Sequence, residues 1–378
     1  MLGTRNRKIR VVVPTVYRPE CPTVRSRLLP LCRELVPKGF EFEFLVIGEG
    51  KNNIEPGITY SGYRSYVELA SRISSSKKRD TDILFPSKPY TITGLLSLLV
   101  ARLKGIGYVL DIDDRTFPSE INKWWRLPLY LQEYFSDRFL KWLKTPTVVA
   151  SRGLAEYWGK HALYAPNSTD LCLFDRTRWN SGYIREKVGL TGQILIWPAV
   201  FFQETDRQYM LDIFAALQKS GEEVVLLVIG DGEYLPHIKS RAKSLKLENV
   251  VFTGTVDYRD MPNYYASATA GLLPMRNNHY DSCKGPIKLF EYMAMELPVI
   301  ATDIGEAREV IPRADCGILI PFDDPDRAAA MIAELMSSSE RLQNLGKNGR
   351  RFLLEQHSFA HHADQLEILL RDCVVNAR

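Results

Sequence analysis

Short apolar runs alternate along the chain with longer segments whose apolar residues recur at helical spacing. A run of β-branched and aliphatic residues that ends in a turn residue is typical of a buried strand. In the first part of the sequence such runs predict strands at 10–14, 42–48, 82–85, 108–112 and 148–150, and helical spacing predicts a helix at 24–36. In the second part they predict strands at 194–197, 224–229, 250–252, 270–273, 299–301 and 317–320, with helices at 208–219, 235–246, 261–266, 287–295 and 357–375.

Strands that alternate with helices indicate an α/β protein with parallel sheets covered on both faces. The chain of 378 residues is long enough for two such domains. We expect a first Rossmann-like domain at 1–178, a second at 179–356, and a C-terminal helix at 357–378 that packs back across both. Ligands of open parallel sheets bind beyond the carboxyl ends of the strands, so two facing domains would enclose a cleft between them.

The charge is uneven along the chain, although the net charge is only +4. Residues 1–180 hold 28 Lys and Arg against 18 Asp and Glu (+10), and the remainder holds 21 against 27 (−6). A basic first domain indicates an anionic partner, such as a lipid surface or a phosphorylated substrate. We expect no nucleic-acid partner, because the sequence shows no nucleic-acid-binding module.

Cysteine spacing and hydropathy bear on the compartment. The six cysteines are scattered without a CxxC pair, which favours a reducing cytoplasm over a disulfide framework or a zinc site. The apolar run before Pro14 is too short for a signal peptide, and Arg102 and Lys104 interrupt the apolar stretch 92–110 before it reaches the length of a membrane span. We therefore expect a cytoplasmic protein, with a peripheral place on the inner face of the membrane as a further option.

Residues 283–305, CKGPIKLFEYMAMELPVIATDIG, carry the most informative pattern. Pro286 suits a helix start, because its missing N–H would have no helical partner there. The N–H groups of Ile287 and Lys288 then lie at the positive end of the helix dipole, which favours a phosphate. Glu291, one turn further, suits two adjacent hydroxyls such as those of a ribose. An ordinary strand–helix unit with an exposed glutamate explains the local pattern equally well.

A resemblance to a known family favours the first interpretation. FEYMAMELPVIATDIGEAREVI resembles the donor-binding signature of the retaining glycosyltransferases of GT-B fold, often called family 4, and Glu291 takes the place of the second glutamate of that signature. VIGDGE, VVFTGTVDYRDMPNYYASATAGLLP, APNSTD and YVLDIDD resemble further segments of the family. The resemblance implies a nucleotide-diphosphate-sugar donor, UDP- or GDP-linked, and no metal or other cofactor. It implies donor-binding positions at Gly230, Asp231, Thr255, Val256, Cys283, Lys284, Gly285, Pro286, Ile287, Lys288 and Glu291.

The chain departs from the family pattern at several positions. Cys283 replaces the first glutamate, and Val200 and Thr205 stand where the family tends to carry an Arg and a Lys that neutralise the leaving diphosphate. Other cations are candidates for that task, namely Arg207, Lys284, Lys288 and Arg276.

The predicted first domain supplies the candidates for catalysis and acceptor binding. Asp111, Asp113 and Asp114 follow a predicted strand, near the point where family members place a His or Asp beside the transferred sugar. We take them as catalytic candidates together with Arg207. A helix cap with solvated neighbours, or a metal site, would also account for the three carboxylates.

Arginines in the first loop are the candidates for the acceptor. Arg18, Arg25 and Arg27 follow the first predicted strand, and cations near a helix start oppose the helix dipole. That conflict indicates use on an anionic acceptor, and plain surface charge is the alternative.

Residues 117–145 mix aromatic and basic residues, a composition typical of a helix at a membrane interface. A core helix with a solvated basic face would show the same composition.

Together these features predict a hexosyltransferase that moves a sugar, with retention, to a hydroxyl acceptor. The expected acceptor is a glycan or lipid-linked intermediate of cell-surface polysaccharide or glycolipid synthesis. The alternative is a degenerate member that binds a nucleotide sugar or a partner without catalysis.

Overall fold

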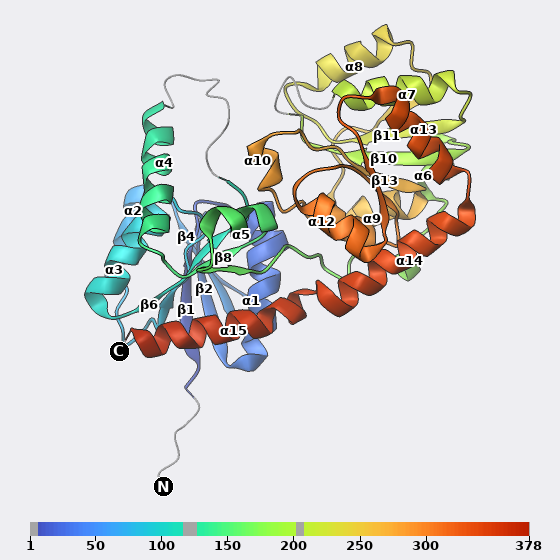
Figure 1. Cartoon of the computed structure of the whole chain (residues 1–378). Coiled ribbons are helices and arrows are strands. Elements are labelled where there is room, and N and C mark those ends of the chain that lie inside the picture. The colour runs from blue at the N-terminus through green and yellow to red at the C-terminus, as the bar shows by residue number, and fades with distance from the viewer. Residues whose placement is uncertain (1–6, 116–126, 202–207, 378) are drawn as a thin grey trace. The chain divides into compact units, whose positions relative to one another are not determined.

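The computed structural model describes residues 7–115, 127–201 and 208–377, and its contacts divide the chain into two compact units. The first unit comprises Met1–Ser168, Cys283–Gly285 and His357–Arg378, and the second comprises Thr169–Ser282 and Pro286–Gln356 (Figure 1). The division falls after Ser168, whereas we predicted it after residue 178. Arg207 and Thr205, and residues 116–126 of the basic aromatic stretch, lie outside the described residues.

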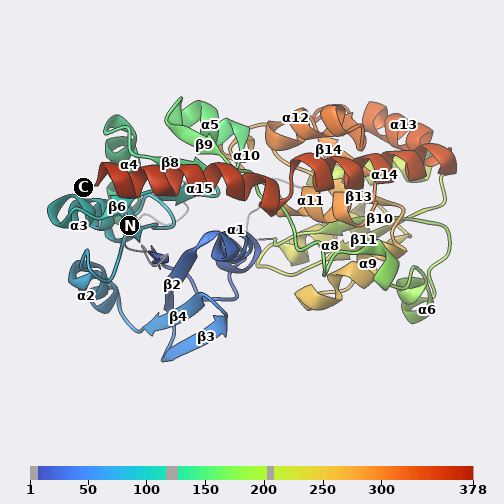
Figure 2. The same ribbon diagram turned by 90° about the horizontal axis from the view of Figure 1, so that it is seen from below.

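The first unit is built on a six-stranded sheet in the order β3-β4-β2-β1-β5-β6 (Figure 2). Its strands are β1 (Ile9–Pro14), β2 (Phe40–Ile47), β3 (Lys51–Glu55), β4 (Ile58–Tyr63), β5 (Ile83–Leu84) and β6 (Gly107–Tyr108). All pair in parallel except β3, which runs antiparallel to β4. A second sheet of three short parallel strands consists of β7 (Leu110–Ile112), β8 (Thr147–Val149) and β9 (Ala162–Tyr164).

Helices cover both faces of the first sheet, as its buried parallel strands require. The helical elements are η1 (Thr23–Leu28), α1 (Leu29–Leu35), η2 (Val36–Lys38), α2 (Tyr66–Ser75), η3 (Thr91–Leu95), α3 (Leu96–Lys104), α4 (Leu127–Trp142), α5 (Arg152–Trp158) and α15 (Phe359–Asn376). Alternate residues of β1 point to opposite faces. Val11 and Val13 therefore pack with α1 and α15, and Val12 packs with α2 and α3.

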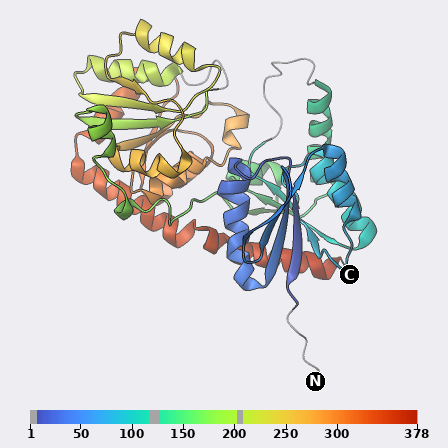
Figure 3. The ribbon, with the colours of Figure 1, turned by 180° about the vertical axis from the view of Figure 1, so that it is seen from behind.

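The second unit is a six-stranded, wholly parallel sheet in the order β12-β11-β10-β13-β14-β15 (Figure 3). Its strands are β10 (Gln193–Pro198), β11 (Val224–Ile229), β12 (Val250–Phe252), β13 (Ala270–Leu273), β14 (Val299–Thr302) and β15 (Gly317–Ile320). This is the doubly wound Rossmann order, in which the strand sequence reverses between β10 and β13.

Helices cover both faces of the second sheet as well. They are η5 (Arg176–Arg178), α6 (Tyr183–Val188), α7 (Gln208–Lys219), α8 (Leu235–Ser244), η6 (Tyr258–Asp260), α9 (Met261–Ser267), α10 (His279–Ser282), α11 (Ile287–Ala294), α12 (Gly305–Ala314), α13 (Pro325–Met336) and α14 (Ser339–Gln356). One core joins the sheet to α9, α11 and α12, and the other joins it to α7, α8 and α13. The predicted α/β fold of two Rossmann-like units is confirmed.

Three local features differ from the predictions. The strand predicted at 108–112 is interrupted at Val109 and contributes β6 to one sheet and β7 to the other. The hairpin of β3 and β4 and the helix α2 were not predicted, because β3 (KNNIE) is a hydrophilic edge strand without apolar alternation. The helix predicted at 24–36 is divided into two elements. It begins with the π-helical turns of η1, and α1 follows with Pro30 in its first turn, where the missing N–H of proline leaves no hydrogen bond to continue the helix from η1.

Candidate functional site

A pocket of about 450 Å³ lies at the carboxyl ends of the strands of the second unit. Val200, Gly230, Asp231, Gly232 and Thr255 line it, and they follow β10, β11 and β12, which are neighbours in the sheet. The structure therefore brings together three residues that the sequence placed in a donor site, Gly230, Asp231 and Thr255. Their position is the one where Rossmann-like sheets bind ligands.

The backbone around Gly230 is tightly packed. Gly230 has φ of 122°, and a Cβ at this residue would lie 1.9 Å from the carbonyl oxygen of Ala199. The Phe201 N–H donates to the carbonyl of Asp231 at 3.0 Å, so the chain beyond β10 is held against the turn that follows β11. Only glycine fits here, and its absent side chain leaves the pocket wall as bare backbone.

Helix α11 begins at Ile287, as predicted, just after the chain passes from the first unit back to the second at Pro286. Pro286 is its N-cap residue, and no side chain caps the helix start. Ile287 and Lys288 are both half-buried in the first turn. Pro286 has no side-chain acceptor, so the N-cap residue itself does not offset the positive end of the helix dipole.

Glu291 is buried on α11, contrary to the interpretation as an exposed glutamate. Its side chain is 4% exposed. Tyr258 donates its hydroxyl to Oε1 at 2.9 Å, and Tyr265 donates to Oε2 at 2.8 Å. Burial, with the Glu291 charge beside it, raises the pKa of Tyr265 well above its usual value, so the phenol stays a donor. A carboxylate accepts hydrogen bonds, and it is the kind of group that two adjacent ribose hydroxyls require.

The sequence analysis did not single out these two tyrosines. Tyr258 lies in η6 and Tyr265 in α9, and Phe174 contacts both rings, with centroids 5.5 Å and 5.9 Å away. Val256, a further predicted donor residue, packs half-buried against the same core. The segment that begins at the pocket with Thr255 thus leads directly to the partner of Glu291.

The upstream part of the predicted donor loop belongs to the first unit. Cys283 is fully buried in a core of that unit, and its carbonyl accepts from the Ser151 hydroxyl at 2.6 Å. The Cys283 side chain is inaccessible to solvent, so its contact with a donor stays a prediction that this burial does not support. Lys284, next to it, is half-buried.

Gly285 is held by the Pro-Asn segment that precedes the second unit. Asn167 donates from Nδ2 to the Gly285 carbonyl at 2.6 Å. A Cβ on Gly285 would lie 2.5 Å from the Ala150 carbonyl oxygen, so a larger residue would push this loop away. The loop that leads into α11 thus has a fixed starting point.

Two of the three predicted catalytic aspartates surround a lysine that the sequence analysis missed. Lys88 follows β5, has φ of 71°, and forms ion pairs with Asp113 and Asp114. Thr23 also donates to Asp113 at 2.6 Å. Burial would raise the pKa of Asp113, but the Lys88 ammonium group holds it below its usual value. Burial raises the pKa of Asp114 against the same attraction.

The third aspartate, Asp111, forms a fully buried ion pair with Arg27. The Arg27 Nη2 and Asp111 Oδ1 atoms are 2.6 Å apart, and both side chains are inaccessible to solvent. Arg27 also donates from Nη1 to the carbonyl of Ala165 at 2.9 Å and to Asn167 Oδ1 at 3.1 Å. The roles of Arg27 in acceptor binding and of Asp111 in catalysis stay predictions, and the buried ion pair gives both residues a structural role in the core of the first unit.

The remaining predicted acceptor residues stay open to solvent. Arg18 is exposed and Arg25 is half-buried. Among the described residues, no group of three His, Cys, Asp or Glu side chains is arranged to hold a metal ion. No disulfide joins the six cysteines, all of which lie in the described residues, and no helix of the described part has the length and hydropathy needed to cross a bilayer.

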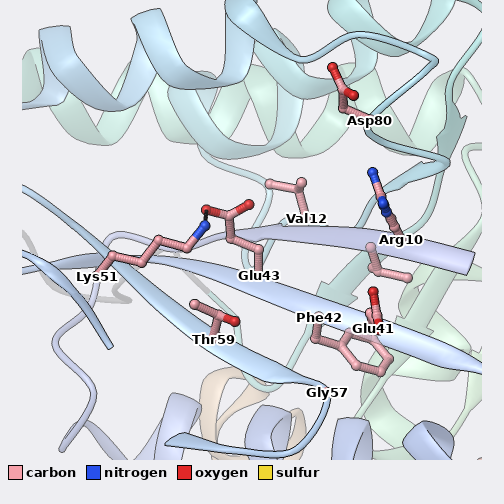
Figure 4. Close-up of a pocket in the computed structure, with 10 residues that line it drawn as sticks. Arg10, Val12, Glu41, Phe42, Glu43, Lys51, Gly57, Thr59 and Asp80 are labelled. Atoms are coloured by element: carbon pink, nitrogen blue, oxygen red, sulfur yellow. Dashed lines mark hydrogen bonds and ion pairs between the residues drawn. The ribbon is translucent and has the colours of Figure 1, made fainter. Parts of the chain in front are cut away.

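A second depression, on the first unit, is lined by charged groups but lies away from the carboxyl ends of the strands. Figure 4 shows Arg10 and Glu41 at the amino ends of β1 and β2, with Glu43 in an ion pair to Lys51 at 3.3 Å. Ser61 donates to Glu43 as well, at 2.5 Å. Glu43, Lys51 and Ser61 satisfy one another and Glu41 pairs with Lys8, so we do not treat the depression as a candidate site.

Comparison with known proteins matches most of the second unit to one family. Residues 184–352 match the family Glycosyl transferases group 1. The chain is 22% identical over 293 residues to the alpha-D-kanosaminyltransferase of Streptomyces kanamyceticus, with 72% of each sequence covered. It is 27% identical over 159 residues to the GDP-mannose-dependent alpha-(1-6)-phosphatidylinositol monomannoside mannosyltransferase of Mycobacterium tuberculosis, with 41% of each covered.

The fold has a close counterpart among solved structures. Sucrose-phosphate synthase from Thermosynechococcus elongatus matches with a TM-score of 0.77 at 16% identity, over 98% of this chain and 100% of the other. At that identity the likeness shows the fold, which is GT-B. The pocket, the buried Glu291 and the start of α11 all lie within the residues of this GT-B protein that match the family Glycosyl transferases group 1.

Proposed function

We propose that the protein is a glycosyltransferase that moves a hexose from a UDP- or GDP-linked donor to a hydroxyl acceptor, with retention of configuration. The observation that carries this proposal is the buried carboxylate of Glu291, which two tyrosine hydroxyls hold in one orientation on α11. A carboxylate held in this way has lost its rotational freedom before a ribose arrives, which lowers the entropic cost of binding.

The nucleotide and the diphosphate have separate places in this proposal. The pocket beyond β10 and β11, with Gly230, Asp231 and Thr255, is the place for the nucleotide. The start of α11, from Pro286 to Lys288, suits the diphosphate, since backbone N–H groups at a helix start favour negative charge. Stabilising the departing diphosphate in this way is the main source of catalysis in such a transfer. Lys284, Lys288 and Arg207 are the proposed cations for it, and the proposal needs no metal ion.

The first unit supplies the proposed acceptor and catalytic groups. Asp113 and Asp114 are fixed around Lys88 at the carboxyl ends of β5 and β7, where one of the carboxylates would orient an acceptor hydroxyl. Arg18 and Arg25 would meet an anionic group on the acceptor. A glycan or lipid-linked acceptor of glycolipid or polysaccharide synthesis fits these groups, and the mannosyltransferase relative acts, by its name, on a phosphatidylinositol mannoside.

One observation favours the alternative of nucleotide-sugar binding without transfer. Val200, which replaces a cation of the family pattern, is exposed and lines the pocket itself. An aliphatic side chain cannot neutralise a leaving diphosphate. Donor turnover separates the two functions, because a binding protein would hold a donor without releasing its nucleotide diphosphate.

A thermal-shift panel of nucleotides and nucleotide sugars tests the shared binding claim. A ligand present at a hundred times its Kd stabilises the folded protein by about 2.7 kcal/mol, which a melting curve resolves easily. We expect UDP- or GDP-linked compounds to raise Tm, and Glu291→Gln to abolish the rise. Glu309→Gln on α12 is the matched control, because this glutamate is exposed. An unchanged rise in Glu291→Gln would refute the ribose assignment.

A further inference from the structure

Helix α4 presents an apolar face to solvent. Leu131, Phe135, Phe139 and Trp142 are all exposed, Phe135 by 64% and Trp142 by 73%. Their spacing of four, four and three residues places them on one side of the helix. Phe139 and Trp142 also stack on each other, with ring centroids 5.9 Å apart. Figures 1 and 3 show α4 projecting from the edge of the first unit.

The opposite side of α4 already makes the contacts that hold the helix to its unit. Leu140 is fully buried, and Ser136 shares a hydrogen bond of 2.7 Å with Thr91 of η3. A surface helix normally turns its apolar residues toward the core and its polar residues outward. Among the α4 side chains that the structure describes, Ser136 and Leu140 are buried, whereas Phe135, Phe139 and Trp142 are exposed.

Basic side chains lie near the apolar face of α4. Arg138 is exposed, and its guanidinium lies 4.3 Å from the centre of the Tyr134 ring. Lys141 lies 3.9 Å from the centre of the Tyr157 ring, and Lys144 is exposed.

The acidic residues of α4 turn inward instead. Glu133 and Asp137 are half-buried, burial raises the pKa of both, and Tyr157 donates to Asp137 at 2.6 Å. The outward charge of the helix from 131 onward is therefore positive.

We propose that the α4 face (Leu131, Phe135, Phe139 and Trp142 with Arg138 and Lys144) docks on the surface of an anionic lipid bilayer. Large aromatic residues with cations beside them suit the boundary between headgroups and acyl chains, where the rings enter the apolar zone and the cations meet lipid phosphates. A second copy of the same face would place like charges together, which disfavours a dimer through α4. Docking of α4 on a bilayer does not depend on the proposed glycosyl transfer. Only the idea that docking presents a lipid-borne acceptor to the enzyme rests on that proposed function.

Vesicle flotation of the full chain tests this docking. We expect binding to phosphatidylglycerol vesicles at least tenfold tighter than to phosphatidylcholine vesicles, since each cation near an anionic surface contributes about 1 kcal/mol. The preference should shrink as salt screens it. The double variant Phe135→Ser/Trp142→Ser should bind at least tenfold more weakly. The matched control is Ile368→Ser/Val375→Ser on α15, whose residues are 62% and 64% exposed, and it should bind like wild type.

Three results would overturn the proposal. They are the absence of flotation of the wild-type chain, equal losses in the two double variants, and light scattering that shows a dimer which Phe135→Ser/Trp142→Ser converts to a monomer. The nucleotide thermal shift is measured on each variant in parallel. A variant that keeps its nucleotide shift is folded, so a loss of vesicle binding is then specific to α4. Flotation without any nucleotide shift would instead contradict the proposed function alone.

Discussion

Arg27→Met should destabilise the first unit more than any exposed charge replacement. The variant leaves the Asp111 carboxylate without its partner in a site that solvent does not reach. It also removes the donors to the Ala165 carbonyl and to Asn167. Breaking one side of a buried ion pair costs about 3–5 kcal/mol, because an uncompensated charge remains. With a urea slope of about 2 kcal/mol per molar, the unfolding midpoint should fall by about 2 M.

The deficit should depend on pH in a defined direction. Burial raises the pKa of Asp111 even with Arg27 beside it. Without Arg27 that pKa rises further, so the folded variant binds the Asp111 proton more tightly than the unfolded chain does. A raised folded pKa gives stability that is present at low pH and is lost as pH rises through it. The difference between variant and wild type should therefore be greatest near neutral pH and shrink on acidification.

Urea unfolding at several pH values measures both effects. Arg33→Met is the control, because the ion pair of Arg33 with Glu55 is solvent-exposed and should contribute at most about 1 kcal/mol. The double variant Arg27→Met/Asp111→Leu should recover most of the loss, since no unpaired charge remains. Equal effects of Arg27→Met and Arg33→Met, or no recovery in the double variant, would refute the reasoning.

Three further predictions concern single residues. Tyr265→Phe removes a hydrogen bond to the Glu291 carboxylate, an interaction worth about 1.5–3 kcal/mol. Nucleotide binding measured by calorimetry should therefore weaken at least tenfold. An unchanged Kd would contradict this prediction. Gly230→Ala should cost more in thermal stability than Gly221→Ala, because both have positive φ but only the former meets backbone atoms, and equal costs would contradict the close packing. Burial lowers the pKa of His362 to about 3. Below pH of about 6.5 the unfolded chain therefore binds a proton at this histidine and the folded chain does not, so the free energy of unfolding falls as pH drops. His362→Leu should therefore lose less stability between pH 7 and pH 5, by about 2 kcal/mol, and the same acid sensitivity in both proteins would count against it.

The sequence determined the sheet of the second unit almost completely, for a physical reason. Its strands are continuous apolar runs, and parallel strands buried on both faces require such runs. The start of α11 at Pro286 was equally clear, because proline has few other acceptable places in a helix. By contrast, β3 carries no apolar pattern, since it forms an exposed edge whose pairing depends on β4.

Side-chain partners far apart in the sequence could not be predicted. Arg27 and Asp111 are 84 residues apart, and nothing in either local pattern shows that they pair in a core. The partners of Glu291 were hidden in the same way, because Tyr258 resembles any surface tyrosine until η6 brings it to α11. Lys88 was missed because it lies in an irregular loop after a strand of only two residues.

Donor turnover tests the central claim most directly. Each of a panel of UDP- and GDP-sugars is incubated with the protein and a lipid extract, and the released nucleotide diphosphate is counted per protein molecule. The account predicts many turnovers with at least one donor, and a loss in Glu291→Gln of at least tenfold in kcat/KM that Glu309→Gln does not share. Binding of a nucleotide sugar without release of its diphosphate from any donor would contradict it.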